Sequence, residues 1–335
     1  MRKACIVVHE FYQKNRLFDL DDIYSNRDNC LYFFYQLKTA LEKQGYLLAT
    51  QDIHTIEESE IVIYNEMPKE LPKIEDREKS YLLIFESELI SKSNWDFHNH
   101  SYFNKIFTWN DTIVDNIKYF KFNFSFQLPQ EISLKFFSEK KLCTLIAGNK
   151  VNSDPRELYS KRVEAIRWFE KNHENDFDLY GIGWEQGEIS NQNKYLRKLK
   201  KLLKIKSRSF SSYKGKIDSK REVLSGYKFA ICYENAKDIP GYITEKIFDC
   251  FFAGCVPVYW GAPNVSDYIP RECYIDKTKF ESYEELYSYL SNMREEEYTR
   301  YIENIKKFLK RDEIRIFSGE INTQNVVQNI LKEEK

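Results

Sequence analysis

The segment "YITEK" (Tyr242–Lys246) places a hydroxyl, a carboxylate and an ammonium group where a helix is expected to begin. It follows the turn pair Pro240-Gly241 and precedes the apolar run "IFDCFFAG". With Thr244 as the N-cap, Glu245 and Lys246 fall in the first turn, where free N–H groups and the helix dipole favour anions. A lysine there suits a phosphate, and a carboxylate suits sugar hydroxyls. The same residues also suit an ordinary helix cap with an acidic first turn, and the segment alone does not decide between the two interpretations.

The elements around this segment predict an α/β unit. "YKFAICYEN" and "VPVYWG" are expected strands on either side of the helix from about Thr244. Before them, "KLCTLIAGN" and "DFDLYGIGW" are expected strands, the second of which ends in a Gly-x-Gly turn. Between those two strands a helix is predicted from 154 to 172, with Asp154 as N-cap and Pro155 at its first position. Open α/β sheets bind ligands at the carboxyl ends of their strands, which is where "YITEK" would lie.

The first half of the chain predicts a second α/β unit. Expected strands are "ACIVVHE", "EIVIYNE", "YLLIFES" and "NKIFTWN", and a helix with apolar spacing is expected to end at Gly45. The pattern breaks between about 125 and 142. We therefore predict an N-terminal domain over 1–135 and a C-terminal domain over 136–335, with a cleft between them.

Composition excludes several classes of function. The 335 residues carry a net charge of −1, which gives no reason to expect nucleic acid as a partner. The seven cysteines are expected to be reduced, and His98 and His100 have no third ligand nearby, so no metal site is predicted. No apolar run has the length of a signal sequence or a membrane span, which predicts a soluble, cytoplasmic protein.

One stretch is strongly basic. From Lys194 to Arg221 there are twelve Lys or Arg residues and one acid, Asp218. Such a run is most often a solvated face, which we favour slightly. The alternative is a surface for an anionic acceptor or for peripheral contact with membrane headgroups at the inner face of the membrane.

A longer string around "YITEK" resembles a known family. "YKFAICYENAKDIPGYITEKIFDCFFAGCVPVYWGAPNV" closely resembles the signature of the α-1,3/1,4-fucosyltransferases, glycosyltransferase family 10. Its parts Tyr-Lys-Phe, Glu-Asn, Tyr-Ile-Thr-Glu-Lys and Gly-x-Val-Pro-Val-x-x-Gly appear in order. "SYKGKIDSK" is also similar, and weaker similarity in "YLLIFES", "SYFNKIFTWN" and "DFDLYGIGW" extends the resemblance over most of residues 80–270.

The resemblance implies a GT-B fold of two Rossmann-like domains, with GDP-fucose held mainly by the C-terminal one. Glu245 would bind the ribose hydroxyls, Lys246 and Tyr242 would face the diphosphate and nucleotide, and Arg162 matches the family's pyrophosphate-binding arginine. Its neighbour Arg167 is interpreted as a surface residue. The remaining donor-side candidates are residues at strand or helix ends: Glu234, Asn235, Thr244, and Gly181, which would allow a close backbone approach or simply a tight turn.

The catalytic base is also implied by the resemblance. Inverting transfer needs a base on the acceptor hydroxyl. The family places a glutamate after an apolar strand of the N-terminal domain, and "LLIFESE" supplies Glu86, with Glu88 as a competitor. The chain departs from the family at Asn110-Asp111, where many members have a Tyr-Arg pair, and this leaves the identity of the donor sugar open.

We therefore expect an inverting transferase that moves L-fucose from GDP-fucose to a glycan, in lipopolysaccharide, capsule or protein glycosylation. No cofactor is expected to be required, although a divalent cation could stimulate without being essential. The alternatives are the same fold with another nucleotide sugar, or a catalytically silent glycan- or nucleotide-binding protein. The intact set of Arg162, Glu245, Lys246 and Glu86 argues against the silent protein.

Overall fold

The structure is a computed structural model that describes residues 2–187 and 209–332. Contacts between residues divide the chain into two compact units. Unit 1 comprises Met1–Leu128, Pro240–Glu245 and Arg311–Lys335, and unit 2 comprises Pro129–Ile239 and Lys246–Lys310. The chain thus enters unit 2 within the segment where a boundary was expected, but it returns to unit 1 twice.

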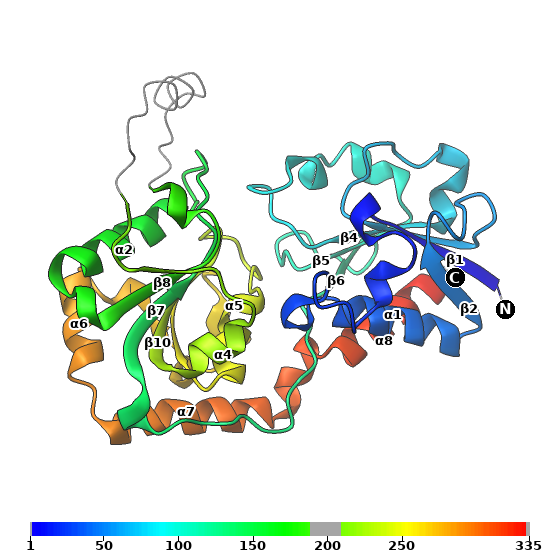
Figure 1. Cartoon of the computed structure of the whole chain (residues 1–335). Helices are drawn as coiled ribbons and strands as arrows, with labels where there is room; N and C mark the ends of the chain where they lie inside the picture. Colours follow the sequence, from blue (N-terminus) through cyan, green and yellow to red (C-terminus); the bar gives the residue numbers. More distant parts are fainter. Residues whose placement is uncertain (1, 188–208, 333–335) are drawn as a thin grey trace, which may run out of the picture. The chain divides into compact units, whose positions relative to one another are not determined.

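Unit 1 is built on a parallel sheet, drawn in blue to cyan in Figure 1. Within the described residues its strand order is β2-β1-β3-β4-β5-β6, and every neighbouring pair is parallel. Apolar runs form these strands because both faces of the sheet are covered. The strands are β1 (Arg2–Val7), β2 (Tyr46–Thr50), β3 (Ile61–Asn65), β4 (Ser80–Ile84), β5 (Lys105–Thr108) and β6 (Tyr119–Lys121).

Two helices cover one face of this sheet side by side, α1 (Tyr32–Lys43) and α8 (Gly319–Leu331) (Figure 1). Buried side chains of both helices pack into one hydrophobic core with the strands, among them Leu37 and Leu41 from α1 and Val327 and Ile330 from α8. The predicted domain 136–335 had included α8. The helix joins the N-terminal sheet instead because its apolar face completes that core.

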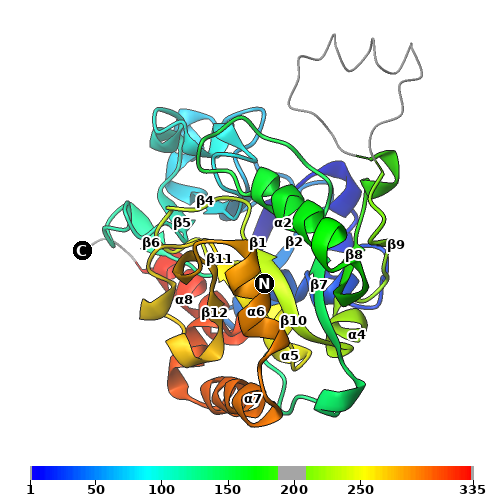
Figure 2. The same cartoon turned by 90° about the vertical axis from the view of Figure 1, so that its left-hand side faces the viewer.

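Unit 2 is a second parallel sheet, with strand order β12-β11-β10-β7-β8-β9 within the described residues. Figure 2 shows α2 and α6 in front of its strands. The strands are β7 (Lys141–Ile146), β8 (Phe177–Tyr180), β9 (Tyr213–Gly215), β10 (Tyr227–Tyr233), β11 (Val256–Trp260) and β12 (Ile275–Asp276). The helices are α2 (Tyr159–Asn172), α4 (Lys220–Ser225), α5 (Glu245–Phe252, whose first residue falls in unit 1), α6 (Tyr283–Ser291) and α7 (Glu295–Leu309).

Helix α2 begins later than the sequence predicts. Asp154 does not cap it, because its carboxylate accepts the N–H of Arg156 at 2.8 Å within a preceding turn. Glu157 is held in an antiparallel bridge with Ala236, which keeps the backbone extended. Its side chain then accepts the N–H of Ser160 at 2.9 Å, inside the first turn of α2. The predicted N-cap was therefore wrong: tertiary pairing overrides a good local capping signal.

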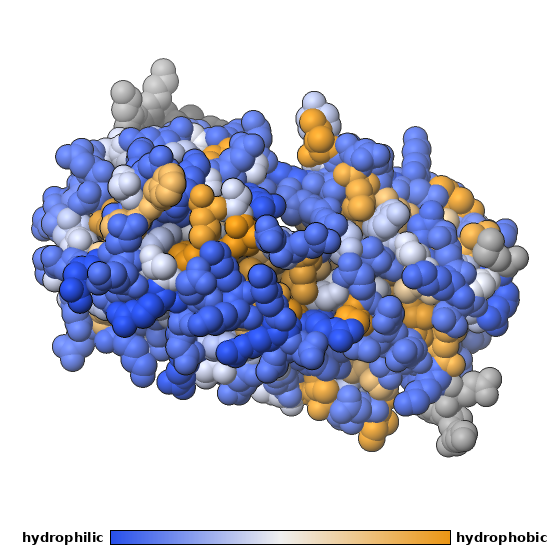
Figure 3. Space-filling model, turned by 90° about the horizontal axis from the view of Figure 1, so that it is seen from below, coloured by the Kyte–Doolittle hydropathy of each residue, from blue (hydrophilic) through white to orange (hydrophobic). Residues whose placement is uncertain are grey.

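The surface in Figure 3 is mainly hydrophilic, with exposed hydrophobic side chains in small separate groups. The most exposed large hydrophobic residues in the described ranges include Tyr24, Ile23 and Phe136. None of the helices in those ranges has the length and apolarity needed to cross a membrane.

Gly181, a predicted site residue, lies directly after β8 at a place where only glycine fits. Its φ is +127°, and an added Cβ would lie 1.9 Å from the carbonyl oxygen of Ala147. The absent side chain therefore allows the backbone of the β8 end to approach the loop after β7. Gly215 in the neighbouring β9 has a similar φ of +120°, but an added Cβ there would meet nothing within 4 Å.

This pair of glycines gives a matched test. Gly181→Ala should lower the free energy of unfolding by about 2–5 kcal/mol, because it adds a steric clash to the strain of a positive φ. Gly215→Ala should lose only about 1–2 kcal/mol, from the strain alone. Urea denaturation of both variants measures the difference. Equal losses would show that the approach to Ala147 does not constrain residue 181.

Candidate active site

The donor side of the candidate site is at the centre of the unit 2 sheet. The chain builds β7, β8 and β9 in one direction and then returns to place β10 on the other side of β7. Such a reversal in strand order is where open α/β sheets bind ligands, outside the carboxyl ends of the strands. The segment before α2 pairs here with the segment after β10. The N–H of Leu158 donates to the carbonyl of Asn235 at 3.1 Å. The N–H of Lys237 donates to the carbonyl of Arg156 at 2.8 Å.

Arg162 extends from the first turn of α2 to the end of β10. Its Nη2 donates to the carbonyl oxygen of Tyr233 at 2.6 Å and to Oδ1 of Asn235 at 3.1 Å. Only 4% of Arg162 is exposed, so its charge is held in a region of low dielectric. Two predicted site residues, Arg162 and Asn235, are thus joined directly. Fixed in this way, the guanidinium is a preorganised cation at the carboxyl end of the strands.

Lys246, in the first turn of α5, lies beside the same strand end. Its Nζ is 3.2 Å from Oε2 of Glu234, the fully buried residue that follows β10. Gly261 makes room for this carboxylate, because an added Cβ there would lie 2.5 Å from Cγ of Glu234. Glu245 is half-buried at the start of α5. The end of β10 and the start of α5 therefore bring Arg162, Asn235 and Lys246 to one part of unit 2.

Tyr242 and Thr244 are both buried, with exposures of 1% and 2%. The Tyr242 ring packs against Trp109 at a centroid distance of 4.6 Å and against Phe124 at 6.3 Å. These contacts lie within unit 1 and anchor the segment Pro240–Glu245 there. The expectation that Tyr242 faces the nucleotide stays a prediction.

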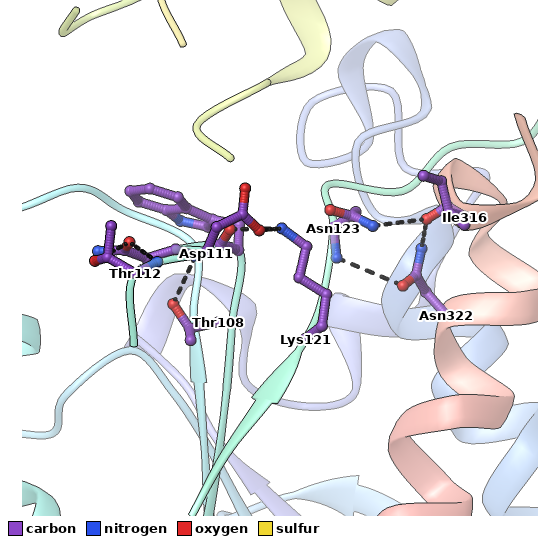
Figure 4. Close-up of polar contacts among 9 residues, drawn as sticks. Thr108, Asp111, Thr112, Lys121, Asn123, Ile316 and Asn322 are labelled. Atoms are coloured by element: carbon purple, nitrogen blue, oxygen red, sulfur yellow. Dashed lines mark hydrogen bonds and ion pairs between the residues drawn. The ribbon is translucent and has the colours of Figure 1, made fainter. Parts of the chain in front are cut away.

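Asp111 takes part in the same anchorage. Its carboxylate pairs with Nζ of Lys121, whose Nζ also donates to the carbonyl of Trp109 at 2.7 Å. Figure 4 shows Lys121 pointing toward Asp111. The same view shows a separate contact, in which Asn123 and Asn322 both donate to the carbonyl of Ile316. The N–H of Asp111 donates to the carbonyl of Pro240, and an added Cβ at Gly241 would lie 2.3 Å from the carbonyl of Trp109. The backbone of Asp111 thus helps to hold the loop before α5, through a hydrogen bond that does not depend on the residue type at position 111.

Glu86, the predicted base, lies two residues past the end of β4 and is half-buried. Its carbonyl oxygen accepts hydrogen bonds from Nε1 of Trp95 at 3.0 Å and from Nδ2 of Asn94 at 3.3 Å. Glu88 is exposed, whereas Ser87 between them is buried. The carboxyl end of a parallel strand is a position from which a side chain can meet a ligand, and hydrogen bonds fix the backbone of Glu86 there.

The structure adds an acidic residue that the sequence analysis missed. Glu66 directly follows β3, the neighbour of β4, and its Oε1 accepts the N–H groups of Phe85 at 2.8 Å and Glu86 at 3.0 Å. Burial raises the pKa of Glu66 to about 7, in spite of its hydrogen bonds to Asn94 and to these two N–H groups. Perturbed carboxyl groups are common near functional sites.

The remaining expectations concern Arg167, the basic stretch and metal-ligating residues. Arg167 is not simply a surface residue, because its guanidinium stacks on Phe210 at 3.8 Å and its Nη1 pairs with Glu170 at 2.7 Å. Residues 194–208 of the basic stretch lie outside the described residues. Across 2–187 and 209–332, no three His, Cys, Asp or Glu side chains gather as they would to hold a metal ion.

Comparison with known proteins agrees with the motif. Residues 183–324 match the model of the glycosyltransferase family 10 (fucosyltransferase) C-terminal domain. The chain is 36% identical over 74 residues to the Helicobacter pylori alpha-(1,3)-fucosyltransferase FucT, and 41% identical over 70 residues to an Arabidopsis thaliana alpha-(1,4)-fucosyltransferase. These matches cover 22% and 21% of this chain but only 15% and 17% of the two relatives.

Solved structures share the fold over nearly the whole chain. An alpha1,3-fucosyltransferase crystallised with GDP-fucose aligns with a TM-score of 0.52 at 13% identity, covering 100% of this chain and 91% of that one. Anabaena HepE in complex with UDP and glucose aligns with a TM-score of 0.55 at 8% identity, covering 99% and 100%. The expected α/β class, two Rossmann-like units of the GT-B type, is confirmed. Residues 183–324 are thus similar to the C-terminal domain of glycosyltransferase family 10, the fucosyltransferase family.

Proposed function

We propose that this protein transfers L-fucose from GDP-fucose to a hydroxyl group of a glycan acceptor, with inversion at the anomeric carbon. The observation that carries the proposal is the grouping of Arg162, Asn235 and Lys246 at the end of β10 and the start of α5. A buried guanidinium, an ammonium and a helix N-terminus suit the two phosphates of a nucleotide diphosphate. The family match over this segment supports GDP-fucose as the donor.

The proposed reaction is a single displacement. The carboxylate of Glu86 takes the proton of the acceptor hydroxyl, and the acceptor oxygen forms a bond to C1 of fucose. The bond between C1 and the β-phosphate oxygen breaks, and GDP leaves with the electron pair. Arg162, Lys246 and the N-terminus of α5 stabilise the negative charge on GDP as it develops. Glu245 would accept hydrogen bonds from the ribose hydroxyls.

A binding protein without catalysis has less support. A glycan-binding protein would need no cationic group for a diphosphate, and neither a glycan-binding nor a nucleotide-binding protein would need a base. A donor other than GDP-fucose stays the alternative, since the chain departs from the family at Asn110-Asp111. The role in lipopolysaccharide, capsule or protein glycosylation, the cytoplasmic location and contact with the membrane stay predictions from the sequence.

The first prediction from this proposed function concerns the diphosphate. Lys246→Ala and Arg162→Ala should each weaken GDP binding by roughly 1.5–3 kcal/mol, about tenfold to a hundredfold in Kd, because each removes a charge-assisted contact. Calorimetric titration with GDP measures this. Lys220→Ala and Arg167→Ala are matched controls, because Lys220 pairs with Asp249 of the same α5 at 2.7 Å and Arg167 lies on the same α2. If all four folded variants bound GDP equally well, the diphosphate site would be refuted.

The second prediction concerns the base. Glu86→Gln keeps the shape of the side chain but cannot take a proton, so the rate of transfer should fall about a hundredfold to ten-thousandfold. GDP affinity should not change, because the cationic residues lie in unit 2. Glu88→Gln is the control, and its effect should be small. The assignment is wrong if Glu88→Gln abolishes transfer while Glu86→Gln remains active.

The third prediction concerns metal ions. If Arg162, Lys246 and the helix dipole neutralise the leaving group, no divalent cation is needed for that step. The rate of transfer measured in excess EDTA should then stay near the untreated rate, with at most a modest stimulation by added cation. A complete loss that manganese restores would overturn this account of the leaving group.

A further inference from the structure

The side chain of Glu66 holds the backbone from which the proposed base extends. One oxygen, Oε1, accepts the N–H groups of both Phe85 and Glu86, at 2.8 and 3.0 Å. Phe85 and Glu86 are the first two residues after β4, where the chain turns away from the strand. A carboxylate that accepts two consecutive backbone N–H groups fixes the direction in which that turn leaves the strand.

The second oxygen of Glu66 completes this arrangement through Asn94. Nδ2 of Asn94, a fully buried residue, donates to Oε2 of Glu66, and its Oδ1 accepts the N–H of Met67 at 2.8 Å. Asn94 and Trp95 also donate to the carbonyl of Glu86. The peptide groups on both sides of the Glu86 Cα are therefore held, one through Glu66 and the other through Asn94 and Trp95.

Glu66 occupies this position at a physical cost. Its φ is +71°, in the left-handed region that favours glycine and asparagine. Burial, with a smaller contribution from the negative charge of Glu86, raises its pKa to about 7. A residue that served only to end β3 would avoid both costs. Strain and a perturbed carboxyl group at one residue are typical of functional sites.

Glu66 could itself be considered as the base, because a pKa near neutrality suits proton transfer. Its contacts argue against this role. Oε1 accepts two backbone N–H groups and Oε2 accepts the amide of Asn94, so both oxygens are engaged by the protein. A base must present an oxygen to the acceptor hydroxyl, whereas these oxygens face the β4 turn and Asn94.

We propose that Glu66 is a positioning residue for transfer: it orients the backbone of Glu86 so that the Glu86 carboxylate reaches the acceptor hydroxyl. The inference rests on the proposed function for its catalytic part, while the restraint on the β4 turn can be tested without any activity. Small displacements of a reacting group change rates strongly, so loosening this turn should reduce kcat rather than the affinity for the donor.

The test measures backbone exchange and kinetics on the same variants. Glu66→Ala removes both acceptor oxygens, so the amides of Phe85 and Glu86 should exchange with deuterium at least about tenfold faster, as followed by mass spectrometry. The kcat should fall roughly tenfold to a hundredfold with an unchanged KM for GDP-fucose. Glu66→Gln keeps a carbonyl oxygen for the two N–H groups, so it should retain most of the protection and most of kcat. Glu70→Ala is the control, because Glu70 is exposed and lies in the same loop.

Each outcome decides the inference. Unchanged exchange at Phe85 and Glu86 in Glu66→Ala would refute the restraint on the turn. Faster exchange with a wild-type kcat would refute its catalytic importance, and a Glu66→Gln variant as impaired as Glu66→Ala would indicate that the charge of Glu66 matters rather than its positioning. If the wild-type protein transfers no fucose, the proposed function and the catalytic part of this inference fail together. The exchange measurement then still supports or refutes the restraint itself.

Discussion

The hydrogen bonds between the segment before α2 and the segment after β10 are the constraint on which the donor side depends. They delay the start of α2 to Tyr159 and place Arg162 so that it contacts the Tyr233 carbonyl and Asn235. The buried guanidinium in turn fixes the strand end that leads to Glu234, the partner of Lys246. One short antiparallel pairing thus determines where the cationic residues of unit 2 lie relative to each other.

In unit 1, side-chain contacts more than backbone pairing hold the loops that leave the sheet. The ends of β3 and β4 are joined by the Glu66 carboxylate, and the loop before α5 is held by the ring of Trp109 and by the backbone N–H of Asp111. Parallel strands put these ends at one edge of the sheet, and polar side chains then fix the loops that leave it. In both units, hydrogen bonds or ring contacts thus hold loops that carry candidate site residues.

Local patterns predicted the elements that depend on local forces. Apolar runs were enough to predict the strands β3, β4, β5, β7 and β10. Gly45, which has a positive φ, was enough to predict where α1 ends. The start of α2 could not be predicted, because its determinant is a bridge to Ala236. Arg162 was found only through the family resemblance, since its carbonyl partner is 71 residues away. Glu66 gave no signal at all, because its partners lie 19 to 28 residues along the chain.

The central claim is the transfer of fucose from GDP-fucose to a glycan. Its most direct test is mass spectrometry of a panel of acceptor glycans after incubation with the protein and, in separate reactions, with GDP-fucose, GDP-mannose or UDP-glucose. The account predicts that an acceptor gains the mass of one deoxyhexose with GDP-fucose and gains nothing with the other two donors. A product formed only with another nucleotide sugar, or no product with any donor while GDP still binds, would contradict it.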